Sequence, residues 1–90
     1  MVWMMTEAYI MIRLDLGAEE DILKEIMEIP EVKEAHRIYG VYDIIIRIET
    51  GMIEELKDVV ERKIRNIEKV HSTLTMIIID VAASDEKHVR

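Results

Sequence analysis

The strongest constraint on the fold is the order in which two apolar periodicities follow one another along the chain. Alternation of apolar and polar residues marks strands, and the i, i+3, i+4 spacing marks helices. The predicted elements are a strand over 7–16, a helix from Glu19 that stops before Pro30, strands over 32–39 and 42–49, a helix from Thr50-Gly51, and a strand over 72–81. After each helix comes a similar segment, Ile29-Pro30-Glu31-Val32 and Ile67-Glu68-Lys69-Val70. The chain therefore reads as a doubled β-α-β unit.

Two such units predict an α+β, ferredoxin-like βαββαβ fold. Right-handed crossovers place both helices on one face of a four-stranded antiparallel sheet. The strand over 42–49 is almost continuous isoleucine, which is typical of a central strand. The strand over 32–39 carries charged residues, which indicates an edge strand.

The sheet face without helices is predicted to be apolar. Its exposed residues would be Tyr9, Met11, Ile45, Ile77 and Ile79, with Thr73 and Thr75 on the same face. An apolar surface of that extent exposed to solvent is unusual for a monomer. We therefore expect two copies to stack their sheets into a homodimer, as a dimeric α/β barrel.

Length and composition narrow the function classes. The 90 residues form one domain over 7–81, with an extension over 1–6 and a polar, flexible tail over 82–90. The net charge of -7 and scattered cations argue against direct nucleic-acid binding. No cysteine and no apolar run of membrane length indicate a cytoplasmic protein with no membrane contact. Abundant isoleucine among many charged residues favours a thermophilic source.

Catalytic and metal chemistry find little support in the sequence. Ser72 and Ser84 lie in no nucleophile motif, and His36 and His71 belong to strands at opposite edges of the predicted sheet. We therefore expect no catalytic residue, no metal site and no cofactor.

The turn Tyr39-Gly40-Val41-Tyr42-Asp43 is the main candidate site. Gly40 suits either a two-residue hairpin loop or a longer loop with a left-handed glycine. Outward N–H groups and the Asp43 carboxylate would suit a zwitterion, with the hydroxyls of Thr73 and Thr75 as further contacts. The alternative is that Gly40 only makes the hairpin and Asp43 only binds nearby backbone N–H groups.

The residues around this turn resemble a known family. Gly40-Val41-Tyr42-Asp43 followed by Ile44-Ile45 is similar to the G-x-Y-D segment in the amino-acid-sensing domain of the Lrp/AsnC feast/famine regulators. The segments Ile29-Pro30-Glu31-Val32 and His71-Ser72-Thr73-Leu74-Thr75 extend the resemblance over about residues 7–80. It implies a ferredoxin-like fold, stacked-sheet dimers that often form a ring of four dimers, and a free amino acid bound between subunits.

Carried over by position, the resemblance implies that Gly40, Val41, Tyr42 and Asp43 cradle the ligand, with Thr73 and Thr75 as hydroxyl contacts. Members of the family usually begin with a helix-turn-helix, whereas this sequence begins at the first strand. The chain therefore looks like a stand-alone sensing domain that would modulate full-length relatives by joining their assemblies. Two alternatives stay open: a small enzyme of the dimeric α+β barrel type, such as a monooxygenase or isomerase, and a ligand-independent oligomerisation scaffold.

Overall fold

The chain forms one antiparallel sheet and two helical segments. The computed structural model describes residues 5–15, 17 and 19–79; the outer part of the expected N-terminal extension, Leu16 and the expected tail over 82–90 lie outside the described residues. The elements are β1 (Thr6–Leu14), α1 (Glu19–Met27), β2 (Val32–Arg37), β3 (Ile44–Thr50), α2 (Ile53–Asp58), the π-helical segment η1 (Val59–Ile64) that continues α2, and β4 (Val70–Ile78). Among the helices of this described part, none has the length and apolar character needed to cross a membrane.

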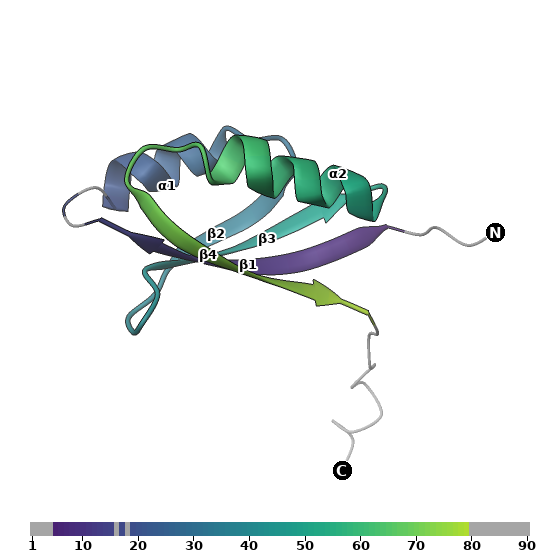
Figure 1. Ribbon diagram of the computed structural model, residues 1–90. Coiled ribbons are helices and arrows are strands. Elements are labelled where there is room, and N and C mark those ends of the chain that lie inside the picture. Colours follow the sequence, from purple (N-terminus) through teal and green to yellow (C-terminus); the bar gives the residue numbers. More distant parts are fainter. Residues whose placement is uncertain (1–4, 16, 18, 80–90) are drawn as a thin grey trace, which may run out of the picture.

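Both helical segments cover the same face of the sheet (Figure 1). The strand order is β2-β3-β1-β4, and every neighbouring pair is antiparallel. The predicted ferredoxin-like α+β fold is thereby confirmed. The polar β2 lies at an edge and the isoleucine-rich β3 lies inside, as their sequences indicated.

The repeated segment after each helix makes the same turn in both halves. Ile29 N–H donates to Ile26 and Val32 N–H donates back to Ile29, at 3.0 Å in both cases. In the second half, Ile67 N–H donates to Ile64 and Val70 N–H donates to Ile67, at 3.1 Å each. Ile29 and Ile67 are both buried at these turns, so each half uses an isoleucine to anchor the return from helix to sheet.

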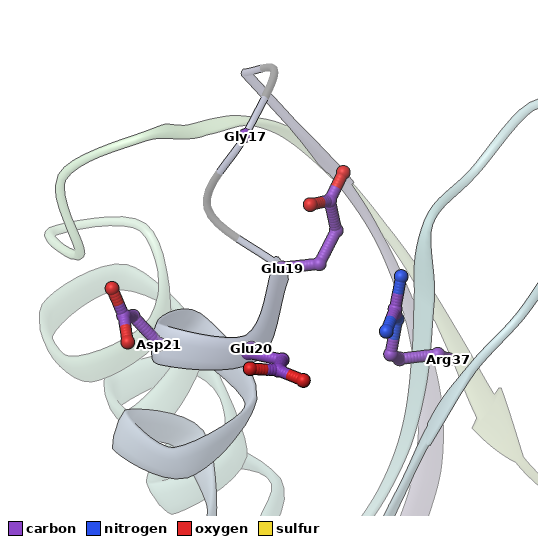
Figure 2. Close-up of a pocket in the computed structure, with 5 residues that line it drawn as sticks. All are labelled: Gly17, Glu19, Glu20, Asp21 and Arg37. Atoms are coloured by element: carbon purple, nitrogen blue, oxygen red, sulfur yellow. The ribbon is translucent and has the colours of Figure 1, made fainter.

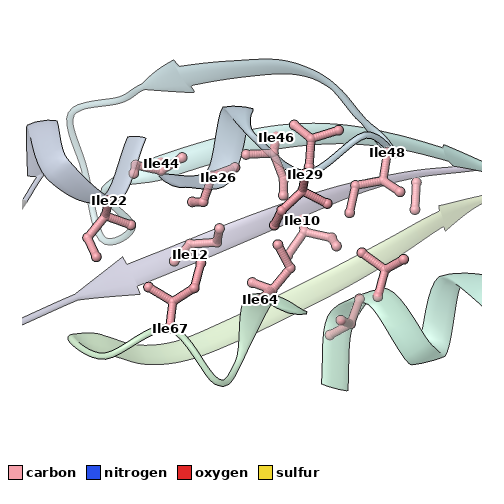
Figure 3. Packing of buried hydrophobic residues seen from close by; sticks show 14 of the residues in the cluster. Ile10, Ile12, Ile22, Ile26, Ile29, Ile44, Ile46, Ile48, Ile64 and Ile67 are labelled. Atoms are coloured by element: carbon pink, nitrogen blue, oxygen red, sulfur yellow. The ribbon is translucent and has the colours of Figure 1, made fainter. Parts of the chain in front are cut away.

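The space between helices and sheet is filled by aliphatic side chains (Figure 3). The sheet contributes alternate residues of β1 and β3, of which Ile10, Ile12, Ile44 and Ile48 are fully buried. The helical layer contributes buried side chains from both halves: Ile22, Ile26, Leu56, Val59, Val60 and Ile64. Isoleucine is β-branched and is therefore favoured in strands. Its side chains pack tightly and fill the centre of the space between the helices and the sheet.

The register of β4 corrects one expectation from the sequence. Residues that lie directly opposite in an antiparallel pair share a face, and β4 pairs Thr73 with Ile12, Thr75 with Ile10, and Ile77 with Ala8. Because Ala8, Ile10 and Ile12 are buried beneath the helices, Thr73, Thr75 and Ile77 lie on the helix side and not on the open face. Ile79, the other expected interface residue, follows the end of β4 and is 94% exposed.

The open face takes the other set of β4 residues. Leu74 lies opposite Met11, Met76 opposite Tyr9, and Ile78 opposite Glu7. The "open-face patch" is therefore Tyr9, Met11, Ile45, Leu74, Met76 and Ile78. The expectation of an apolar face without helices holds, although β4 supplies different residues to it.

Candidate ligand site at the loop between β2 and β3

The loop between β2 and β3 extends from the sheet on the side opposite the helices (Figure 1). It is closed by Ile38 N–H, which donates to the carbonyl oxygen of Asp43 at 2.9 Å, so four residues lie between the two ends. At its tip, Tyr39 is fully exposed and Val41 is 75% exposed. Two apolar side chains held in water on a projecting loop indicate a contact surface.

Gly40 does not have the backbone conformation expected from the sequence. The loop is longer than two residues, and among the described glycines only Gly17 has a positive φ, of 86°. A Cβ added at Gly40 would meet no heavy atom within 4 Å. Neither a left-handed conformation nor close packing within the chain therefore requires glycine at this position.

Asp43 is held against the end of β1. Its Oδ2 accepts a hydrogen bond from Leu14 N–H at 2.7 Å, and its own N–H donates to Ile12 O at 2.9 Å. The side chain is half-buried. One part of the alternative interpretation is therefore correct, because Asp43 does satisfy a backbone donor. The bond uses Oδ2 and leaves Oδ1 to face other groups.

A hollow of about 400 Å³ lies beside this loop. It joins the loop to the end of β1 and the start of β4 through Arg13, Leu14, Asp15, Val41, Asp43 and His71. His71 Nδ1 lies 3.6 Å from Asp15 Oδ1 across the two strand ends. The hollow combines a guanidinium, two carboxylates and an imidazole, which can bind a small charged molecule.

Sequence reasoning found only half of this hollow. It selected Val41 and Asp43 and missed Arg13, Asp15 and His71. The signal that could have found them is topological: β1 ends where β4 begins, so Arg13 lies opposite Ser72 and next to the loop that follows β2.

The structure does not bring the two predicted threonines into this hollow. Thr75 lines a separate hollow of about 380 Å³ between α2, η1 and β4, together with Leu56, Lys57, Val60, Glu61 and Ile77. Thr73 shares the helix side of β4 with Thr75. Within one chain, the loop residues 40–43 and the two threonines therefore belong to different surfaces.

The charged part of the open face is a cluster of one cation and three anions. Arg47 on β3 pairs with Glu7 on β1 at 2.8 Å, with Glu34 on β2 at 2.9 Å, and with its own strand neighbour Glu49. The hydrogen bond from Arg47 lowers the pKa of Glu49, and bonds from His36 and Arg47 lower that of Glu34. The pKa of Arg47 is raised by its hydrogen bonds to the three glutamates, and the bond to Glu49 has the largest effect. This "Arg47 cluster" links three strands.

A second charged hollow, of about 350 Å³, lies at the start of α1 (Figure 2). Glu19 and Glu20 extend on the side of Arg37 from β2, whereas Asp21 points away from it. Three carboxylates in a first helical turn are ordinary stabilising partners of the helix dipole. Within the described ranges, no three histidine, aspartate or glutamate side chains converge to hold a metal ion.

Comparison with known proteins gives this architecture a family. The model of the Lrp/AsnC ligand binding domain matches residues 7–87. The uncharacterized HTH-type transcriptional regulator PF0250 of Pyrococcus furiosus is 32% identical over 75 residues, which is 80% of this chain and 50% of that protein. The chain thus spans about half the length of the curated relatives it matches.

Solved structures agree in fold. FFRP-DM1 superimposes with a TM-score of 0.80 at 35% identity, over 82% of this chain and 99% of that one. A transcriptional regulator from Neisseria meningitidis shares the fold at a TM-score of 0.78 and 13% identity, over 91% of this chain and 58% of that one. The chain belongs to the Lrp/AsnC family and corresponds to its ligand-binding domain.

Proposed function

We propose that this chain is a non-enzymatic, cytoplasmic module that binds a free amino acid and regulates transcription factors of the Lrp/AsnC type. The observation that carries the proposal is the hollow beside the loop, where Asp43 and Arg13 offer opposite charges around a space of about 400 Å³. An amino acid is a small zwitterion, and each of its charged groups needs a partner of opposite sign. The Neisseria meningitidis regulator of the same fold was crystallised as a complex with L-Met.

The ligand would be held by both its charged groups. Asp43 is fixed through Oδ2, so Oδ1 can accept from the ligand ammonium without breaking the bond to Leu14. The Arg13 guanidinium would bind the carboxylate with two parallel hydrogen bonds. Val41 lines the same space, and the backbone N–H groups of Val41 and of its neighbours Gly40 and Tyr42 would be further donors.

A second copy would complete the site. The loop beside the hollow extends from the sheet on the open-face side (Figure 1), and its Tyr39 and Val41 side chains are exposed. Stacking of two open-face patches would bury Tyr9, Met11, Ile45, Leu74, Met76 and Ile78 and give a homodimer. Thr73 and Thr75 contribute hydroxyls only if they meet the loop of a neighbouring subunit. Such contacts would extend the dimer toward a tetramer of dimers.

A catalytic role has weaker support. Enzymes of the dimeric α+β barrel type need a roomy cavity between helices and sheet, and here that layer is packed with buried aliphatic residues. The hollow at its edge, beside Thr75, has no histidine or aromatic lining residue. The relatives are named as transcriptional regulators, which favours a regulatory partner such as a full-length regulator of the family.

Isothermal titration calorimetry with each of the twenty amino acids tests the proposal. We expect at least one to bind, and we expect Gly40→Ala to weaken that binding. A Cβ at Gly40 has free space within the chain and Gly40 has no positive φ, so the substitution does not lower the free energy of unfolding. A loss of affinity would then report contact with the ligand or the second copy. Met52→Ala is the control, at a side chain that is 60% exposed and that follows the end of β3, whereas the loop precedes the start of β3.

If no amino acid binds to the folded protein, the proposal of ligand sensing is wrong. The result would then favour the alternative of a ligand-independent oligomerisation scaffold. If binding occurs and Gly40→Ala leaves the affinity unchanged, the ligand lies elsewhere. The hollow beside Thr75 would then be the next place to test.

A further inference from the structure

A β-bulge at the start of β4 directs His71 into the hollow beside the loop. Along β1 and β4, Arg13 pairs with Ser72 and Leu14 pairs with Val70. His71 is therefore an extra residue of β4, with no residue of β1 directly opposite it. Strict alternation would place His71 on the face of Leu14, which is buried beneath the helices. A bulge changes the direction of a side chain, and here His71 lines the hollow instead.

The backbone just before this bulge has an uncommon conformation. Lys69 has a φ of 82°, and no other described residue apart from glycine has a positive φ. Residues other than glycine rarely adopt this conformation, and such residues cluster at functional sites. The carbonyl oxygen of Lys69 accepts a hydrogen bond from Asp15 N–H at 2.8 Å. This bond ties the backbone of Asp15 to the segment that leads into His71.

The carboxylate of Asp15 is open to a ligand. Its Oδ1 lies 3.6 Å from His71 Nδ1, and the side chain is 60% exposed. In the described part of the chain, His71 is the one residue that forms an ion pair with it. Asp43 differs, because one of its oxygens already accepts from Leu14 N–H. Both oxygens of Asp15 can therefore accept hydrogen bonds from a bound molecule.

The charges that line the hollow do not balance. They are the guanidinium of Arg13 and the carboxylates of Asp15 and Asp43, with the imidazole of His71 counted as neutral. A neutral amino acid would place its carboxylate on Arg13 and its ammonium on Asp43, which leaves Asp15 without a cation. A ligand with one further positive charge would balance the hollow, whereas a ligand with a further negative charge would be repelled by Asp15.

We propose that the hollow selects an amino acid with a cationic side chain, such as lysine or arginine, and that Asp15 determines this specificity. The inference rests on the proposed function and adds a ligand class to it. Asp15 accepts a charge-assisted hydrogen bond from the ammonium or guanidinium of the ligand side chain. Val41, which lines the same hollow, packs against the methylene groups of that side chain. His71 borders the Asp15 carboxylate and is a positioning residue.

Calorimetric titration of the wild-type protein with lysine and with norleucine tests this specificity. Norleucine has the four-carbon side chain of lysine without the ammonium group. We expect lysine to bind roughly tenfold or more tightly than norleucine, because only lysine can bond to Asp15 through a charge. Equal affinities, or tighter binding of norleucine, would overturn the inference and leave amino-acid sensing intact. If none of the twenty amino acids binds, the proposed function is wrong and this inference is wrong with it.

Variants of Asp15 show whether this residue makes the distinction. Asp15→Asn keeps the size of the side chain, and we expect it to weaken lysine binding roughly tenfold or more while norleucine binding stays the same. Asp15→Glu keeps the charge and should retain the preference for lysine. Asp58→Asn, at an exposed side chain on α2 outside the hollow, is the control, since it removes the same charge from the chain. An equal loss for both ligands in Asp15→Asn, or the same loss of lysine binding in Asp58→Asn, would contradict the proposal.

Discussion

Asp43 has two separable roles at the residue scale, as a backbone acceptor and as a negative charge. Asp43→Ala would leave the half-buried Leu14 N–H without its partner at 2.7 Å, at a cost of about 1–2 kcal/mol in the free energy of unfolding. Asp43→Asn keeps an acceptor oxygen and removes the charge. We therefore expect Asp43→Asn to retain most of the stability and to lose amino-acid binding, as measured by urea unfolding and calorimetry.

The opposite pattern would contradict this division of roles. If Asp43→Asn binds the ligand as well as the wild type does, the ligand ammonium has another partner. Asp15 lines the same hollow and would then be substituted in the same way.

The Arg47 cluster predicts that the stability of the fold depends on pH in the acidic range. The hydrogen bond from Arg47 lowers the pKa of Glu49 below the ordinary value of 4.5. The carboxylate of Glu49 is therefore harder to protonate in the folded protein than in the unfolded chain. A lowered pKa stabilises the fold above the unfolded value and ceases to do so as pH falls through the folded value. We expect the free energy of unfolding to fall between about pH 5 and pH 3.

Glu49→Gln would make that decline shallower, which urea unfolding at several pH values can measure. Glu54→Gln, an exposed glutamate outside the cluster, is the control and should keep the wild-type slope. Equal slopes for the wild type and Glu49→Gln would show that the ion pairs of Arg47 do not persist in solution.

At the scale of elements, one glutamate fixes the start of α2. Glu55 Oε1 accepts from Gly51 N–H at 2.8 Å and from Met52 N–H at 2.9 Å, and so satisfies backbone donors that the helix leaves open. We expect Glu55→Ala to lower the free energy of unfolding by about 1 kcal/mol. Its neighbour Glu54 makes no such bond among the described contacts, so Glu54→Ala is the control. Thermal unfolding of both variants is the measurement, and equal midpoints would contradict the cap.

The elements themselves were largely predictable from local patterns. The alternation in β1, the isoleucine run of β3 and the helical spacing in α1 are each contained in one segment, and the structure confirms their types. The edge position of β2 also followed from its own charges. In these four segments the periodicity or composition of the segment itself indicates which residues are buried or exposed.

The face of β4 could not be predicted in the same way. Its two sides carry Leu74, Met76 and Ile78, or Thr73, Thr75 and Ile77, and both sets can be buried. Pairing with Ala8, Ile10 and Ile12 decides between them, and that pairing joins the two ends of the sequence. A shift of one residue in a strand exchanges its faces, so alternation alone leaves the choice open.

The candidate site was predicted in part for a related reason. The loop residues 40–43 are adjacent in sequence, and the G-x-Y-D pattern made them visible. Arg13 and His71 lie far from them along the chain and reach the hollow only because β1 separates β3 from β4. The conformation of Gly40 was wrongly inferred, because glycine permits a left-handed backbone and does not require it.

At the scale of the whole molecule, the open-face patch predicts a dimer that can be broken without unfolding the chain. Met11→Lys places a charge at the centre of the patch, on a side chain that is only partly buried in one copy. We expect a monomer in light scattering after size-exclusion chromatography, with unchanged circular dichroism. Met27→Lys, at a side chain 48% exposed on α1, is the control and should leave the assembly intact. Wild-type assembly in Met11→Lys would place the main interface elsewhere.

The uncharged stretch of β4 in an acidic chain has a consequence for ionic strength. Each copy has a net charge of -7, so two copies repel at long range, whereas residues 70–79, which supply Leu74, Met76 and Ile78 to the open-face patch, contain no acidic residue, lysine or arginine. Screening shortens the range of repulsion from about 30 Å at 0.01 M salt to about 3 Å at 1 M. We expect the dissociation constant of the assembly to fall as sodium chloride is added, measured by sedimentation. Weakening by salt would instead reveal ion pairs between subunits, and Arg13 would be the first cation to substitute.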